Sequence, residues 1–152
     1  MRNENPFDLP LSIRKFITVA AVLAMECEAV ILDEPTAGQD LYGIELLHNI
    51  IAELYAQGKT VITITHDIEF AAENFQRIVV MAHRQILKDG TPEEVFADEP
   101  VLNEAMLKGP CSGRLARRLN LHGEILTNEQ FLDAFCRIYE RGASNEVINK
   151  EE

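Results

Sequence analysis

The segment "AVILDEPTAGQD", residues 29–40, decides the fold. Its four leading apolar residues are typical of a buried strand in a parallel sheet, so we expect a strand over residues 28–33. Asp33 and Glu34 come at the end of this run, and Pro35 follows at once. Neighbouring side chains of a strand point to opposite sides, so the two carboxylates can take different roles.

The following segments predict a helix and a second strand. Asp40 can cap a helix that runs to about Gln57, and Gly58 provides its C-terminal stop. The β-branched run "TVITIT", residues 60–65, predicts the second strand, and His66 comes directly after it. Strand, helix and strand in this order indicate an α/β fold with a parallel sheet.

The remaining elements follow from the same patterns. Residues 12–25 are apolar nearly all round and predict a buried helix. Further on we expect a short helix at 68–75 and two more strands at 77–82 and 85–90. A helix capped by Thr91 with Glu94 should follow at 91–97, and a last helix capped by Thr127 at 127–141. Residues 1–110 are predicted to form the sheet domain and residues 111–152 a small C-terminal helical appendage whose last residues, 142–152, are frayed.

Composition excludes several classes of protein. A formal net charge of −11 over 152 residues argues against nucleic acid as a partner, because binding it needs a basic face. The three cysteines form no CxxC pair, which favours a reducing compartment. The apolar run at residues 16–25 has the size of a signal-peptide core, but acidic residues precede it, so a buried helix is the better interpretation.

Three side chains are candidates for chemistry because ligands of open α/β sheets bind beyond the carboxyl ends of the strands. Asp33 and Glu34 end one predicted strand and His66 ends the next. One carboxylate could hold Mg²⁺ while the other acts as general base towards water. Each residue alone also has a plainer explanation: a solvated strand end for the acids, a turn residue for His66 and a helix cap for Asp40.

The ordered combination "ILDEPTAGQD", a helix, and "TVITITHD" resembles the ATP-binding subunits of ABC transporters. The resemblance implies a partial P-loop NTPase (RecA-like) sheet with ATP and Mg²⁺ as cofactors. Asp33 would coordinate Mg²⁺, Glu34 would activate water and His66 would contact the γ-phosphate. Asp40 would communicate across a nucleotide-sandwich dimer.

The stretches "VLAMECEAVILDEPTAGQD", "ILKDGTPEEVF" and "GRLARRLNLHGEILTNEQFLDAF" are similar to the ATPases of energy-coupling-factor importers and their cobalt and nickel relatives. That resemblance implies uptake of vitamins or transition-metal ions, driven with a second ATPase subunit and an integral-membrane subunit. It also implies a cytoplasmic location, peripheral on the inner face of the cell membrane.

Two departures from the family weaken the expected ATP site. Nothing in the 152 residues reads GxxxxGK[ST], the loop that cradles the β- and γ-phosphates. The signature Leu-Ser-Gly-Gly-Gln aligns with "LPLSI", residues 9–13, where Pro10 replaces the serine and Leu11 and Ser12 replace the glycines. Ser12 could still offer its hydroxyl at a helix N-terminus. We therefore expect a degenerate signature motif.

Three functions remain open at this point. The first is the C-terminal portion of an importer ATPase of the energy-coupling-factor type. This portion would be incomplete without a partner or a missing N-terminal half. The second is a non-catalytic interaction module that dimerises through residues 111–141, with apolar contacts at Leu115, Leu119, Phe131 and Phe135. The third, a soluble ABC-type ATPase in repair or translation, is disfavoured by the acidic balance and the importer-like tail.

Overall fold

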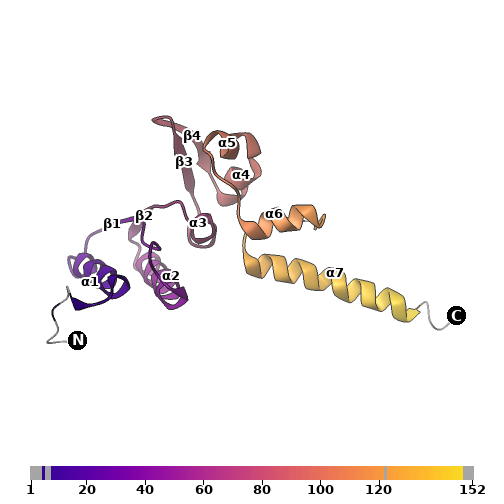
Figure 1. Ribbon diagram of the computed structural model, residues 1–152, viewed down its shortest axis with the longest axis horizontal. Helices are drawn as coiled ribbons and strands as arrows, with labels where there is room; N and C mark the ends of the chain where they lie inside the picture. Colours follow the sequence, from indigo (N-terminus) through magenta and orange to yellow (C-terminus); the bar gives the residue numbers. More distant parts are fainter. Residues whose placement is uncertain (1–4, 6–7, 122, 149–152) are drawn as a thin grey trace. The chain divides into compact units, whose positions relative to one another are not determined.

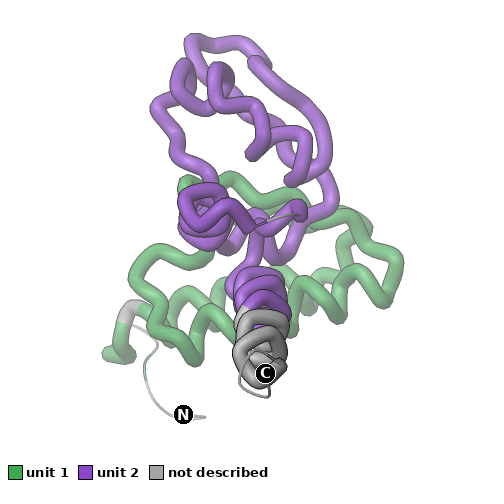
Figure 2. Tube along the Cα trace, turned by 90° about the vertical axis from the view of Figure 1, so that its right-hand side faces the viewer, with its two compact units in different colours: residues 1–67 green, residues 68–152 purple. Residues whose placement is uncertain are grey.

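The structure is a computed structural model that describes residue 5, residues 8–121 and residues 123–148. For residue 11 and residues 139–148 it describes the backbone alone. The chain divides into two compact units, Met1–Asp67 and Ile68–Glu152 (Figures 1 and 2). The predicted boundary after residue 110, between a sheet domain and a helical appendage, stays a prediction.

Unit 1 is a helix followed by a strand, helix and strand. Strands β1 and β2 pair in parallel, with Ala29 opposite Thr60 and Asp33 opposite Ile64, and α2 connects them. The α/β class and the parallel pair are therefore as predicted. The bounds are α1 Leu11–Leu23, β1 Ala29–Asp33, α2 Leu41–Ala56 and β2 Thr60–Ile64.

Local signals set the ends of α2. The Asp40 carboxylate accepts a hydrogen bond from the amide of Gly43 at 2.8 Å, which satisfies one of the free N–H groups of the first turn. Gly58 has a φ of +73°, the left-handed conformation that ends a helix. Both predictions from the sequence are confirmed.

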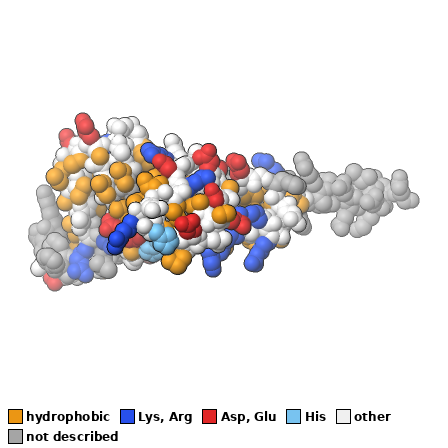
Figure 3. Space-filling view, turned by 90° about the horizontal axis from the view of Figure 1, so that it is seen from above, with side chains coloured by type: hydrophobic (Ala, Val, Ile, Leu, Met, Phe, Trp, Pro, Cys, Tyr) orange, Lys and Arg blue, Asp and Glu red, His pale blue; other side chains and the backbone are white. Residues whose placement is uncertain are grey.

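The two faces of the β1–β2 sheet differ in burial. Val30, Leu32 and Val61 are buried on the face that α2 covers, with Leu47, Ile51 and Leu54 of α2 also buried. The opposite face leaves Ile31 64%, Ile62 49% and Ile64 58% exposed. In Figure 3 hydrophobic side chains gather on the side where Figure 1 draws β1 and β2.

This arrangement corrects two predictions. β1 was expected to be a central strand, but in the described residues it pairs with β2 alone. The first helix was expected to be buried, but every described side chain of α1 is at least partly exposed. Both corrections have the same physical reason. An apolar element is buried only where other elements cover it, and β1 and α1 are each covered on one side.

Unit 2 contains a β-hairpin followed by helices. The two further predicted strands are present as β3 and β4, which pair antiparallel in a sheet of their own within the described residues. His83 and Arg84 both have positive φ, 52° and 65°, the conformation of a tight two-residue hairpin turn. The elements are α3 Ile68–Asn74, β3 Ile78–Ala82, β4 Gln85–Gly90, α4 Pro92–Ala97, α5 Glu99–Glu104, α6 Cys111–Arg118 and α7 Asn128–Ile148.

The core of unit 2 lies between the hairpin and the short helices α4 and α5. Val80, Val95, Phe96 and Leu102 form one buried cluster. The helix α4 begins with the predicted capping box: the Thr91 hydroxyl accepts from the amide of Glu94, and the Glu94 carboxylate accepts from the amide of Thr91. Val79, Met81 and Ile86 of the hairpin are 42%, 68% and 62% exposed, so the helices of unit 2 cover only part of its sheet.

Helices α6 and α7 form the end of unit 2. Gly113 of α6 permits close packing, because a Cβ there would lie 2.6 Å from the carbonyl oxygen of Ile125. The predicted cap of α7 is confirmed, since the Thr127 hydroxyl accepts from the amide of Gln130 at 3.2 Å. The helix runs to Ile148, further than the predicted end near residue 141. Fraying beyond Ile148 lies outside the described residues.

Candidate functional site

The parallel pairing of β1 and β2 brings Glu34 and His66 together. Both strands end at the same edge of the sheet, with Asp33 paired to Ile64, so the residues that follow them are neighbours. The Nδ1 atom of His66 lies 2.8 Å from Oε1 of Glu34, and the amide of His66 donates to the same oxygen at 3.1 Å. The predicted convergence of these two side chains is therefore present.

The backbone of Glu34 takes an uncommon conformation. Its φ is +45°, in the left-handed region that L-residues other than glycine rarely adopt. Its amide nevertheless donates to the carbonyl oxygen of Ile64 at 2.8 Å, so the ladder between the strands continues to this residue. Such local strain is concentrated at functional sites, where the surroundings hold it in place.

The hydrogen bond to Glu34 sets the tautomer of His66. An ionised carboxylate can only accept, so Nδ1 carries the proton and donates it to Oε1. The side chain of His66 is 81% exposed, which leaves Nε2 available to a ligand. Nε2 accepts a proton or hydrogen bond when the ring is neutral and donates one when the ring is charged. The Glu34 carboxylate, 34% exposed, can still reach water.

Two further residues hold this edge of the sheet in place, and the sequence reasoning missed both. The ammonium group of Lys15 on α1 donates to the carbonyl oxygens of Glu34, at 3.2 Å, and Ala37, at 2.6 Å. The Thr65 hydroxyl donates to Oε2 of Glu34 at 3.4 Å and accepts from the amide of Asp67. No sequence signal points to Lys15, because its partners are carbonyl oxygens 19 and 22 residues further along the chain.

Asp33 lies apart from this hydrogen-bonded group. It is exposed, and its carboxylate makes no hydrogen bond or ion pair with the described residues. It follows Ile31 on the open face of the sheet by strand alternation. A free carboxylate of this kind fits Mg²⁺, which is commonly bound by one or two carboxylates together with substrate phosphates and water. No group of three or more acidic, His or Cys side chains suited to a metal occurs among the described residues.

The other two predicted binding residues do not contact the Glu34–His66 pair. Asp40 is exposed and its carboxylate caps α2, as already described. Ser12 lies in the first turn of α1, and its hydroxyl makes no hydrogen bond with the described residues. The residue before this helix is Pro10, which offers no side-chain cap. Roles for Asp40 and Ser12 towards a nucleotide stay predictions.

Curated relatives match most of the chain. An energy-coupling factor transporter ATP-binding protein EcfA2 from Mycoplasmopsis synoviae is 35% identical over 150 residues, 97% of this chain and 48% of the relative. The protein of the same name from Methanospirillum hungatei is 39% identical over 118 residues, 78% of this chain and 30% of the relative. The chain thus spans half or less of the length of these relatives. No protein-family model matches the chain.

Solved structures agree with this likeness. The structure of cbiO1 from Clostridium perfringens, described as part of the ABC transporter complex cbiONQ, matches with a TM-score of 0.56 and 31% identity, over 76% of this chain and 45% of that one. The ADP conformation of an ATP-binding cassette of an ABC transporter matches with a TM-score of 0.57 and 25% identity, over 64% of this chain and 40% of that one. The chain is therefore a homologue of the ATP-binding proteins of energy-coupling factor ABC transporters.

Proposed function

We propose that these residues form the hydrolytic side of an ATP site in an importer ATPase of the energy-coupling factor type. Glu34 positions and deprotonates the attacking water, and His66 contacts the terminal phosphate through Nε2. Asp33 supplies the carboxylate for Mg²⁺, which would offset phosphate charge when bound. The observation that carries the proposal is the 2.8 Å contact between Glu34 and His66 at the carboxyl ends of two parallel strands.

This site needs polypeptide beyond the 152 residues to hold the nucleotide. In P-loop ATPases the phosphate cradle is a glycine-rich loop with a lysine, and no GxxxxGK[ST] occurs in the sequence. The open face of the sheet at Ile31, Ile62 and Ile64 supports the same inference, because exposed apolar faces of this kind are covered in stable assemblies. The cradle would come from the same polypeptide or from another subunit.

The segment expected to serve a second nucleotide is degenerate. Pro10 lacks an amide proton, and Leu11 and Ser12 carry side chains where the family has glycines. Side chains there keep backbone amides from approaching a phosphate closely. We therefore propose that Ser12 and Asp40 contribute to a weak composite site at a dimer interface.

The proposed setting follows from the relatives. Their printed names describe ATP-binding proteins of energy-coupling factor transporters, and cbiO1 is described as part of a transporter complex. We propose that this chain acts with an integral-membrane subunit, at the cytoplasmic face of the membrane, in uptake of vitamins or transition-metal ions. Among the described residues, no helix is long and apolar enough to cross a bilayer.

The test is ATP turnover by the purified 152-residue chain, alone and with a polypeptide that carries the phosphate loop. We expect no appreciable turnover by the chain alone. With the complementing polypeptide we expect turnover that Glu34→Gln abolishes and that His66→Ala strongly reduces. Turnover by the chain alone that Glu34→Gln abolishes would overturn the claim that the site is incomplete.

A second function is supported by α7. Leu132, Phe135 and Ile138 lie at spacings of three residues and are 59%, 46% and 50% exposed, which gives an apolar stripe along the helix. Phe131 and Phe135 also stack, with ring centroids 6.0 Å apart. On this alternative the chain is a non-catalytic module that dimerises through its C-terminal helices. Sedimentation that shows a monomer, unchanged when residues 111–152 are deleted, would contradict it.

A further inference from the structure

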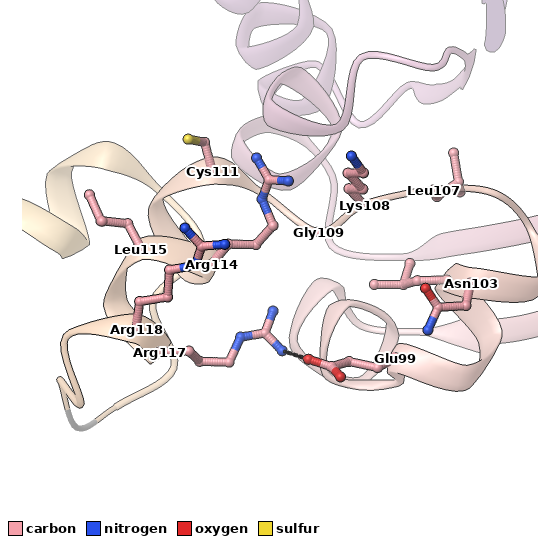
Figure 4. Close-up of a pocket in the computed structure, with 11 residues that line it drawn as sticks. Glu99, Asn103, Leu107, Lys108, Gly109, Cys111, Arg114, Leu115, Arg117 and Arg118 are labelled. Carbon is pink, nitrogen blue, oxygen red and sulfur yellow. Dashed lines mark hydrogen bonds and ion pairs between the residues drawn. The ribbon is translucent and has the colours of Figure 1, made fainter.

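Unit 2 contains a groove that the proposed ATP site does not use. It lies between α5, α6 and the segment that joins them, and its volume is about 540 Å³ (Figure 4). This volume is in the range of small-molecule sites. The lining includes four cationic side chains and one carboxylate, namely Lys108, Arg114, Arg117, Arg118 and Glu99.

Most of this positive charge has no partner among the side chains that the structure describes. Arg117 donates to Glu99 at 2.9 Å, so these two charges offset each other. Lys108, Arg114 and Arg118 make no ion pair or side-chain hydrogen bond within the part of the chain that the structure describes. In Figure 4 the Lys108 and Arg114 side chains end on one side of the opening, and the Arg117–Glu99 pair lies on the other.

The cationic cluster runs against the charge of the whole protein. The formal net charge is −11, yet residues 108–118 contain four basic residues and no acidic one. Lining of one sign in a cleft focuses the local field and attracts ions of opposite charge. The N-terminus of α6 is not the source of this effect, because the Glu69 carboxylate already accepts from the amide of Cys111 at 3.1 Å.

We propose that this groove binds a phosphate-bearing anion. Arginine presents a planar fork of N–H donors that matches phosphate oxygens, and Lys108 adds a mobile point charge. Leu102, Leu107 and Leu115 also line the groove, so it can hold an apolar portion next to the phosphate. Either a free phosphate compound or the headgroup of an anionic lipid presents this chemistry.

The experiment uses the full 152-residue chain and two probes. Inorganic pyrophosphate is titrated by calorimetry, with citrate as an anion that carries carboxylates instead of phosphates. Vesicles of phosphatidylcholine with phosphatidylglycerol, and vesicles of phosphatidylcholine alone, are tested by cosedimentation. The variants are Arg114→Gln and Lys108→Gln, singly and together, with Arg137→Gln on α7 as matched control, because Arg137 is an exposed arginine outside the groove.

We expect one probe to bind, and each groove substitution to weaken its binding by about tenfold to a hundredfold, as for loss of one charged hydrogen bond. Arg137→Gln should leave binding unchanged. Binding of pyrophosphate identifies a free phosphate compound as the source, and selective binding of phosphatidylglycerol vesicles identifies a lipid headgroup. Three results would each overturn the proposal: no binding of either probe, equal binding of citrate, or insensitivity to the groove substitutions. Because Glu34 and His66 are unaltered in these variants, failure here leaves the proposed ATP site standing.

Discussion

The two units solve the burial of a two-stranded sheet differently. In unit 2 the short helices α4 and α5 cover part of the hairpin β3–β4, with Val95 and Phe96 almost fully buried, while Val79, Met81 and Ile86 of the hairpin are 42%, 68% and 62% exposed. In unit 1 the parallel pair β1–β2 is covered on one face by α2, while Ile31, Ile62 and Ile64 are exposed on the other. Each unit therefore has a buried core and exposed apolar side chains on its sheet, but only in unit 1 do candidate hydrolytic residues lie at the end of the sheet strands.

The difference indicates where stability and function reside. Unit 2 can gain its hydrophobic free energy from contacts within itself. Unit 1 places its candidate hydrolytic residues at the edge of a sheet whose second face is bare. Burial of about 25 cal/mol per Å² on that face would become available only when another polypeptide covers it. Unit 1 therefore has both an ATP site without a phosphate loop and a sheet with one uncovered face.

The largest expected effect is in the core of unit 2. Phe96→Ala removes a buried ring, 2% exposed, and should lower the free energy of unfolding of this unit by about 3–5 kcal/mol. Ile31→Ala on the open face of unit 1 should change it by less than about 0.5 kcal/mol. Urea unfolding followed by hydrogen exchange of individual amides gives a separate value for each unit. Comparable losses for the two substitutions would contradict the contrast between a buried core position in unit 2 and an exposed sheet position in unit 1.

A smaller effect is expected at the helix caps, where the two units behave alike. Asp40→Ala in unit 1 and Thr91→Ala in unit 2 each remove an acceptor for a first-turn amide. Each should cost about 1 kcal/mol of local stability, because the amide is left to water. Asp40→Asn, which keeps an acceptor, is the matched control. Hydrogen exchange confined to α2 or α4 measures the effect, and equal losses for Asp40→Asn and Asp40→Ala would argue against capping.

Features of local origin were predictable from the sequence. The caps at Asp40, Thr91 and Thr127 and the two strands of unit 1 rest on residues close together in the chain, and the structure has them all. The closeness of Glu34 and His66 was also predictable from the sequence, because parallel pairing fixes which strand ends meet.

Features that depend on distant partners were not predictable. Burial of α1 failed because it depends on what covers the helix. The antiparallel β3–β4 pair depends on a hairpin turn at His83 and Arg84, two residues that seldom adopt positive φ and so give no turn signal. The support from Lys15 to the carbonyl oxygens of Glu34 and Ala37 likewise appears only when α1 lies beside that loop.

Charging the open face should alter association more than stability. Ile62→Lys places an ammonium group on a side chain that is already 49% exposed, so the free energy of unfolding should change by about 0.5 kcal/mol or less. A lysine on an unpaired sheet face should reduce self-association, which sedimentation velocity measures. Leu47→Lys, at a buried position of α2, should instead unfold unit 1. Self-association of Ile62→Lys equal to that of the wild type would show that the chain does not associate through the open face.

The smallest expected effect is a pH dependence in unit 2. Hydrogen bonds from Lys88 and from the amide of Val101 lower the pKa of the Asp98 carboxyl. The stabilisation that comes from a lowered pKa is fully present above the pKa of the carboxyl in the unfolded chain, about 3.9. It is lost as the pH falls through the lower pKa of the same carboxyl in the folded protein. Asp98→Asn should therefore flatten the acid limb of the thermal midpoint against pH. An acid limb identical to that of the wild type would contradict this contribution.

Calorimetry of MgATP with the 152-residue chain tests the central claim most directly, with Asp33→Asn and Arg114→Gln as paired variants. The account predicts no binding that depends on Asp33, because the chain contains no cradle for the phosphates. Any heat should persist in Asp33→Asn and disappear in Arg114→Gln, which would place it in the basic groove of unit 2. Binding that Asp33→Asn weakens and Arg114→Gln leaves intact would mean that the chain builds a nucleotide site by itself, and the claim of an incomplete ATP site would be wrong.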